Sequence, residues 1–396
     1  MDSLFLAIIV LVVAWSLVAT VAQRFNLSDR NIDVAPFQII ARTQRLTGVI
    51  DAIAQSARPF WKAFAFVGLI VGVGAMVLTT SNFLFVGRML LEKPSSATGV
   101  QLVIPGVTLP LVYSLIGLMT VVVVHEFSHG IIARLRDIPL KSVGVGILAI
   151  LPFAFVEPDE EGMEHTTPRS RSEVYAAGSM ANISLAVITF AIIFLAVIPQ
   201  LSATGLAIAS VEPGTPAEAA GLEKGMVIQE ITYGGTTYGI DSYETFSSIM
   251  DLTSPNTMIE LVTDHGTFSF ELGTHPQRDV GYIGVQTYDR SQMRSINPIV
   301  AFLYPPLVLG IDPAVFPEAF SSASWAVIKS LEYIFFLNVG IGLFNMLPIG
   351  PLDGGRIFRE GMEKLFPAGV ARSISVFVSV LIVVLIVASL VVPYVM

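Results

Sequence analysis

Long runs of apolar residues are the feature that most limits what this chain can fold into. A bilayer core is crossed by about 20 apolar residues in a helix. An open strand or loop facing lipid would leave its backbone hydrogen bonds unmade there. Six apolar runs of this order lie at residues 4–22, 63–86, 111–133, 174–198, 324–347 and 374–392. The sequence therefore predicts an α-helical polytopic membrane protein with about six transmembrane helices.

The composition agrees with a membrane location and excludes several functional classes. Of 396 residues, 53% are hydrophobic and 13% are charged, against about 25% charged in soluble domains. A net charge of −9 without a dense basic patch argues against nucleic acid as a direct partner. The sequence has no cysteine, which excludes disulfides, cysteine-ligated zinc and a cysteine nucleophile. The first run begins with Asp2 where a cleavable signal would be basic, so we expect it to be retained.

The distribution of basic residues predicts the orientation of the spans. Most lysines and arginines fall into three segments: residues 23–62, the loop after the third run, and the stretch between the last two runs. They are Arg24, Arg30, Arg42, Arg45, Arg58, Lys62, Arg134, Arg136, Lys141, Arg169, Arg171, Arg356, Arg359, Lys364 and Arg372. If six spans alternate, these segments share one side, which the positive-inside rule assigns to the cytoplasm. Both termini and the largest polar insert of this multi-pass cell-membrane protein are then expected outside.

Two apolar stretches are too short or too broken to span a bilayer. Residues 142–156 contain two glycines and a proline, and residues 298–311 contain a Pro-Pro pair. Irregular backbone at membrane depth is tolerated only where it is buried in protein or lines a cavity. We expect residues 142–156 to form a re-entrant or β-like element next to the histidine motif that precedes it. A surface amphipathic loop is the alternative.

The third apolar run carries His125, Glu126 and His129 within five consecutive positions. A charged side chain at membrane depth costs about 2.5–3.5 kcal/mol on insertion scales. Three titratable groups at this depth therefore indicate a functional site. Positions four apart share one face of a helix, and both imidazoles can point at one ion. Glu126 is close enough to act at that ion without being a ligand. This is the His-Glu-x-x-His pattern of zinc metalloproteases.

A catalytic zinc site needs a third protein ligand. Asp353 is the best candidate, because it follows the fifth run on the same predicted side as the histidine motif. Prolines before Asp353 end the helix, and two glycines after it allow close backbone approach. The other histidines fit less well: His165 lies in an acidic loop, and His265 and His275 lie in the polar insert on the opposite predicted side.

The polar insert, residues 202–290, is expected to form a small domain with short strands such as 206–211 and 258–263. Its segment 211–231, VEPGTPAEAAGLEKGMVIQEI, resembles the signature of bacterial-type PDZ domains, although Met226 stands where that family usually has Asp. The resemblance implies a small α/β PDZ-like extracytoplasmic domain. Such domains bind extended peptides at a sheet edge. A folded plug that screens substrates by size is the alternative.

The sequences HEFSHG, from residue 125, and NMLPIGPLDGG, from residue 345, flank this insert. In this order they resemble the site-2 protease family of membrane-embedded zinc metalloproteases. The resemblance runs from about residue 111 to residue 356. The segment AFVEPDEE, from residue 154, is similar to archaeal members.

The resemblance implies roles for individual residues. His125, His129 and Asp353 would bind one zinc ion per chain, and Glu126 would be the catalytic acid–base. Asn345 would hold the substrate or the developing oxyanion. The expected substrates are single-span membrane proteins in the lipid bilayer that another protease has already trimmed, and the active site is expected near the cytoplasmic side.

Two residues of the fourth run, Gly178 and Asn182, match a Gly-x-x-x-Asn pattern of the same family. Small residues at this spacing suit close packing between membrane helices. We therefore interpret both mainly as packing residues.

The sequence suggests five divisions of the chain. They are N-terminal spans and a cytoplasmic linker (1–110), a first part of the protease core (111–200), the PDZ-like domain (201–297), a second part of the core (298–360) and a C-terminal span (361–396).

Two other functions compete with this interpretation. A prenyl-protein-processing protease would carry His-Glu-x-x-His but complete its site with a downstream Glu motif, whereas this chain has Pro-Leu-Asp-Gly. A transporter or degenerate scaffold would make the histidine motif accidental. Zinc analysis of the purified chain separates the enzyme from the scaffold.

Overall fold

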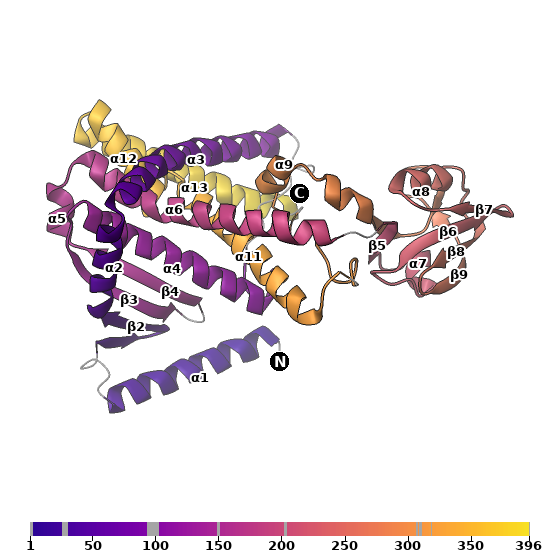
Figure 1. The fold of residues 1–396 in the computed structure, drawn as a ribbon, viewed down its shortest axis with the longest axis horizontal. Coiled ribbons are helices and arrows are strands. Elements are labelled where there is room, and N and C mark those ends of the chain that lie inside the picture. The colour runs from indigo at the N-terminus through magenta and orange to yellow at the C-terminus, as the bar shows by residue number, and fades with distance from the viewer. Residues whose placement is uncertain are drawn as a thin grey trace. The chain divides into compact units, whose positions relative to one another are not determined.

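The computed structural model describes residues 3–25, 31–92, 103–148, 151–201, 204–305, 308, 311–317 and 319–395 (Figure 1). The chain forms two compact units. Met1–Val187 together with Tyr333–Met396 make the first, which we call the membrane unit, and Ile188–Glu332 make the second, the inserted unit.

Five helices among the described residues are long and apolar enough to cross a membrane. They are α3 (Arg58–Glu92), α4 (Leu111–Leu135), α6 (Pro168–Ile192, continued by irregular turns to Gln200), α11 (Ser322–Phe344) and α13 (Ala368–Val395). They contain most or all of five predicted runs and confirm the polytopic helical class. The remaining run, 4–22, lies in α1 (Ser3–Arg24), whose apolar stretch Val12–Ala22 is shorter, so the sixth span stays a prediction.

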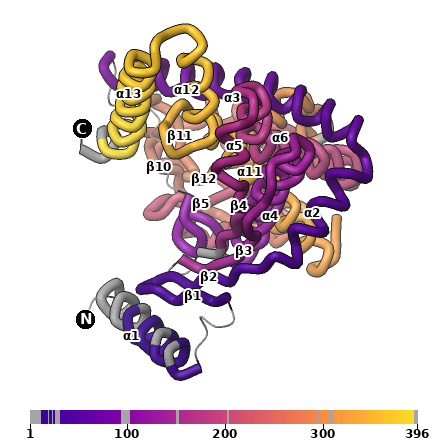
Figure 2. The backbone as a smooth tube through the Cα atoms, turned by 90° about the vertical axis from the view of Figure 1, so that its left-hand side faces the viewer, coloured from indigo at the N-terminus to yellow at the C-terminus, as the bar shows by residue number. Residues whose placement is uncertain are grey.

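A four-stranded antiparallel sheet accompanies these helices in the membrane unit. Its strands, in spatial order, are β1 (Ile32–Ala35), β2 (Gln38–Thr43), β3 (Leu140–Leu148) and β4 (Leu151–Pro158) (Figure 2). The prediction of a β-like element at residues 142–156 is therefore confirmed, as the β3–β4 hairpin. The pairing of β2 with β3 was not anticipated. It requires a glycine in β3, because a Cβ at Gly146 would lie 2.5 Å from the Ile39 carbonyl oxygen.

The apolar core of the membrane unit lies where α2 (Arg45–Ser56), the C-terminal half of α4 and the hairpin meet. Ile50 of α2 and Ile132 of α4 are fully buried there. Val143 and Val156 bring β3 and β4 into the same cluster. The hairpin is thus packed against the helix that carries the histidine motif, and its position is fixed by burial of apolar side chains.

Ion pairs join the three basic segments of the sequence at one end of the membrane unit. Arg134 at the end of α4 pairs with Asp51 of α2. Arg171 of α6 binds Glu360 of α12 (Asp353–Leu365) through two contacts of 2.6 and 2.9 Å. The three segments that are predicted to share one side of the membrane thus contact one another.

The inserted unit contains a six-stranded antiparallel sheet with its own buried core. The spatial order is β12 (Val285–Asp289), β5 (Leu206–Val211), β6 (Val227–Tyr233), β8 (Met258–Thr263) and β9 (Gly266–Glu271), with β7 (Thr236–Gly239) also paired to β6. The short helices α7 (Pro216–Ala219) and α8 (Tyr243–Met250) complete it. Both strands predicted in this region have the predicted bounds. A separate β-rich domain is confirmed, and β12 forms one edge of its sheet.

Candidate metal centre

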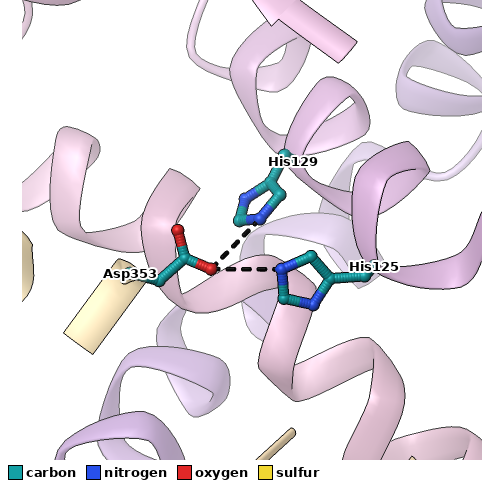
Figure 3. A group of neighbouring side chains, drawn as sticks. All are labelled: His125, His129 and Asp353. Atoms are coloured by element: carbon teal, nitrogen blue, oxygen red, sulfur yellow. Dashed lines mark hydrogen bonds and ion pairs between the residues drawn. The ribbon is translucent and has the colours of Figure 1, made fainter. Parts of the chain in front are cut away.

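His125, His129 and Asp353 come together although 228 positions separate His125 from Asp353 in sequence (Figure 3). The two histidines are one turn apart on α4, and Asp353 is the first residue of α12. Asp353 Oδ2 lies 3.1 Å from His125 Nε2 and 3.3 Å from His129 Nε2. The candidate ligand atoms all lie within 4.8 Å of one another. One oxygen and two nitrogens thus converge on a single point.

The surroundings of these side chains suit a zinc ion. Their exposed fractions are only 9%, 12% and 12%, in the order His125, His129, Asp353. His129 Nδ1–H donates to the Val174 carbonyl oxygen over 2.7 Å, which orients the ring with Nε2 directed at Asp353. Burial opposes ionisation of the Asp353 carboxyl, but the adjacent imidazoles outweigh it and hold its pKa below the ordinary value. Two imidazoles and a carboxylate are a known ligand set for catalytic zinc.

The turn between α11 and α12 delivers Asp353 to the histidines. The Gly354 N–H donates to the Asn345 carbonyl oxygen over 2.8 Å, so the chain folds back on itself. A Cβ at Gly354 would lie 2.2 Å from the Met346 carbonyl oxygen, and one at Gly355 would lie 2.1 Å from that of Ile349. The close backbone approach predicted for these two glycines is therefore present, and it places Asp353 at the start of a helix.

A cavity of about 680 Å³ opens at the three ligand residues. Glu126 lines it, and its Oε2 lies 3.3 Å from the backbone N of Val156 in β4. Asn345 also lines it, with Nδ2 3.3 Å from His125 Nε2. Further lining residues are Phe155, Glu157, Pro158, Glu160, Met163, Glu164, Val174, Tyr175, Pro351, Leu352 and Arg356. Both predicted catalytic residues thus stand beside the ligands and face space that a substrate can enter.

The remaining histidines are not part of this group. His165 ends α5 (Glu160–His165), is mostly exposed and lies 3.9 Å from Glu161. His265 and His275 belong to the inserted unit, where His265 contacts Asp264 and His275 packs against Tyr282.

Helix α6 passes directly behind the imidazoles. A Cβ at Gly178 would lie 2.5 Å from His129 Nε2 and 2.6 Å from His125 Nε2. Asn182, one turn later, is fully buried with its amide 3.1 Å from His125 Nδ1. Interpreting this pair mainly as packing residues missed their contact with the histidines. The four-residue spacing of Gly178 and Asn182 could have indicated this contact, because positions four apart on a helix face the same neighbour.

Comparison with known proteins identifies the family. Residues 113–388 match the sequence model of peptidase family M50. The chain belongs to peptidase family M50. This is the site-2 protease family, so the resemblance found in the sequence is confirmed. Together with the His125–His129–Asp353 group, membership makes this multi-pass membrane protein a zinc metalloprotease.

Relatives of this M50 protein occur in archaea, bacteria and plants. It is 24% identical to an uncharacterised protein of Methanocaldococcus jannaschii over 92% of this chain and 87% of the relative. It is 25% identical to a putative zinc metalloprotease of Clostridium perfringens over 64% of this chain and 88% of the relative. It is 24% identical to the chloroplastic membrane metalloprotease ARASP of Arabidopsis thaliana over 61% of this chain and 67% of the relative.

The space behind the imidazoles yields a first prediction. Gly178→Ala places a methyl group against both Nε2 atoms, so we expect zinc affinity to fall at least about tenfold, as when a supporting group of a metal site is changed. Zinc bound per purified chain, measured by competition with a chelator, checks this. Gly340→Ala in α11 is the control, because no atom lies within 4 Å of the added Cβ. Equal zinc binding by both variants contradicts the prediction.

Proposed function

We propose that this chain hydrolyses peptide bonds inside transmembrane helices of membrane-anchored substrates, with zinc held by His125, His129 and Asp353. The observation that carries the proposal is the place of the ligands. Two of them belong to α4, a helix long and apolar enough to cross a bilayer, and the cavity beside them also contains an acidic side chain. A protease site built on such a helix meets substrate backbone that is itself in the membrane.

The reaction divides between the metal and two side chains. Zinc, when bound, supplies a Lewis acid that polarises the scissile carbonyl and acidifies water. Glu126 takes a proton from the attacking water and later gives it to the leaving amine. The contact with the Val156 N–H holds the Glu126 carboxylate over the cavity. The Asn345 side-chain amide donates to the developing oxyanion.

Replacing Glu126 by Gln separates metal binding from catalysis. The variant keeps all three metal ligands and loses the proton acceptor, so we expect full zinc content and a loss of turnover of at least about 10²-fold. Asp353→Asn provides the contrast, because it should lose zinc as well as activity. The measurement is cleavage of trimmed single-span substrates by the chain reconstituted in bilayers, with zinc counted in the same samples. Undiminished turnover by Glu126→Gln removes the assignment.

The substrate must unwind locally, because a helix closes its own backbone hydrogen bonds. We propose that the unwound strand adds to the free edge of β4. The order of the sheet supports this, since β3 is the one strand paired with β4 among the described residues. The Val156 N–H points away from β3, toward Glu126. Alternate residues of a strand direct their N–H groups to the same edge, which leaves the Ala154 N–H for substrate.

A proline substitution tests whether substrate pairs with this edge of β4. Ala154→Pro removes the N–H that faces away from β3, and we expect turnover to fall about five- to tenfold, the value of one hydrogen bond of about 1–1.5 kcal/mol. Ala154→Val is the matched control, because it adds bulk and keeps the N–H. Reconstituted cleavage assays measure both variants. If the proline variant matches the valine variant, substrate does not pair at this position.

We further propose a cytoplasmic location for the metal centre. The ion pairs of Arg134 and Arg171 support it, because they gather the basic segments at one end of the membrane unit. On this orientation both termini and the predicted PDZ-like domain, residues 201–297, are extracytoplasmic. Substrates with large ectodomains would then need trimming by another protease. The five divisions predicted for the chain are proposed on the basis of this orientation.

Residues 201–297, which belong to the inserted unit, are proposed to be a PDZ-like domain. A groove of about 280 Å³ lies between α8 and the edge strand β12, lined among others by Phe246, Ile283 and Val285. An edge strand beside a groove with apolar residues in its lining suits an extended peptide, with backbone pairing to β12 and a side chain in the groove. Filtering of substrates by size alone is the competing proposal for the same unit.

Titration of the full-length chain with labelled peptides distinguishes these two proposals. Peptides with an apolar last residue and a free carboxylate are expected to bind, and the same peptides with an amidated end are expected to bind less tightly. Fluorescence anisotropy measures both. If no peptide of either kind binds, the size filter is the better description.

A further inference from the structure

Asn182 makes a hydrogen bond whose direction decides how His125 is used. The side chain is fully buried in α6, and its Nδ2 lies 3.1 Å from His125 Nδ1. Its Oδ1 is buried and has no hydrogen-bond partner among the described residues. A buried acceptor without a donor is unfavourable. His125 Nδ1 could supply that donor, but it lies beside Asn182 Nδ2, at the other end of the same amide.

Rotating the amide by half a turn exchanges its oxygen and nitrogen. The two atoms are not distinguished by shape, so their assignment depends on the hydrogen-bond network. The rotated amide presents Oδ1 to His125 Nδ1.

The position of the proton on the His125 ring selects between the two orientations of the Asn182 amide. Its Nε2 faces the Asp353 oxygen that His129 Nε2 also faces, so Nε2 is the atom directed at the shared metal position. A metal-binding nitrogen carries no proton, and the proton of a neutral imidazole then sits on Nδ1. His129 already follows this arrangement, with Nδ1–H donating to the Val174 carbonyl oxygen. For His125, Asn182 is the residue in the corresponding place.

We propose that the Asn182 carbonyl oxygen accepts a hydrogen bond from His125 Nδ1–H and so fixes the imidazole tautomer that leaves Nε2 free for the metal. Asn182 is a positioning residue, because it acts through His125. The inference rests on the proposed zinc site and adds to it a residue that the sequence suggested only for packing. Gly178 and Asn182 then have complementary roles: the first leaves room for the rings, and the second orients one of them.

Two near-isosteric substitutions test the direction of the bond. Asn182→Asp keeps an acceptor and removes the donor, whereas Asn182→Leu removes both. We expect zinc affinity, measured by chelator competition on the purified full-length chain, to be retained in Asn182→Asp and to fall about 10–100-fold in Asn182→Leu. Equal loss in both variants shows that the amide donates, and no loss in either shows a packing role. Both results overturn the proposal.

A control and a second readout separate positioning from general damage. Asn338 of α11 is also fully buried, and its Oδ1 has no partner among the described residues. Its Nδ2 donates to Thr120 and contacts no histidine, so Asn338→Leu should leave zinc affinity unchanged. In ¹⁵N-histidine NMR of the zinc-loaded chain, the His125 Nδ1–H proton should move downfield in Asn182→Asp, since a carboxylate is the stronger acceptor. An unmoved resonance contradicts the proposal even if Asn182→Leu does not fold. If the unmodified chain binds no zinc, the proposed function itself fails.

Discussion

Two imidazoles and one carboxylate converge on a single point, and the packing of the membrane unit around them depends on this arrangement. Titratable groups in or beside apolar helices are unfavourable unless they are paired, and each of these three has a partner. The Val174 carbonyl oxygen takes the His129 Nδ1–H, and Asp353 faces both Nε2 atoms. The neighbouring glycines follow from the same requirement. Gly178 and Gly354 stand where any side chain would overlap the rings or the backbone that presents Asp353.

This convergence depends on three helices keeping their register, because the ligands come from α4 and α12 while α6 lies behind them. The ion pairs near the ends of these helices provide that alignment. Arg136, just after α4, pairs with Glu173 of α6, and the two contacts between Arg171 and Glu360 tie α6 to α12. A bidentate guanidinium–carboxylate pair fixes orientation as well as distance. Basic residues from which the orientation in the bilayer is predicted thus also help to align the helices that carry the metal ligands.

Strand β4 connects the metal centre to the substrate proposed for it. Its Val156 side chain is buried in the core against α4, and its Val156 N–H contacts the Glu126 carboxylate. The other edge of this strand pairs with no strand in the described part of the chain. A substrate strand added there would lie beside the proton acceptor, so substrate binding and positioning of the base use one rigid element. Burial of the hairpin against α4 is what keeps that edge from shifting.

The sequence alone determined the features that depend on local composition. Five of the six predicted apolar runs coincide with helices long and apolar enough to cross a bilayer. The spacing of His125 and His129 predicted a shared helix face, and the prolines and glycines around Asp353 predicted a turn with close backbone approach. These follow from the chain's own periodicity and from the limits a bilayer places on backbone hydrogen bonds. Only the tertiary structure decided which distant groups meet. The pairing of β2 with β3, the contact of Val156 with Glu126 and the place of Asn182 behind His125 join segments separated by 30 positions or more. No local pattern encodes such contacts, because they arise from how separately formed elements bury their apolar faces against one another.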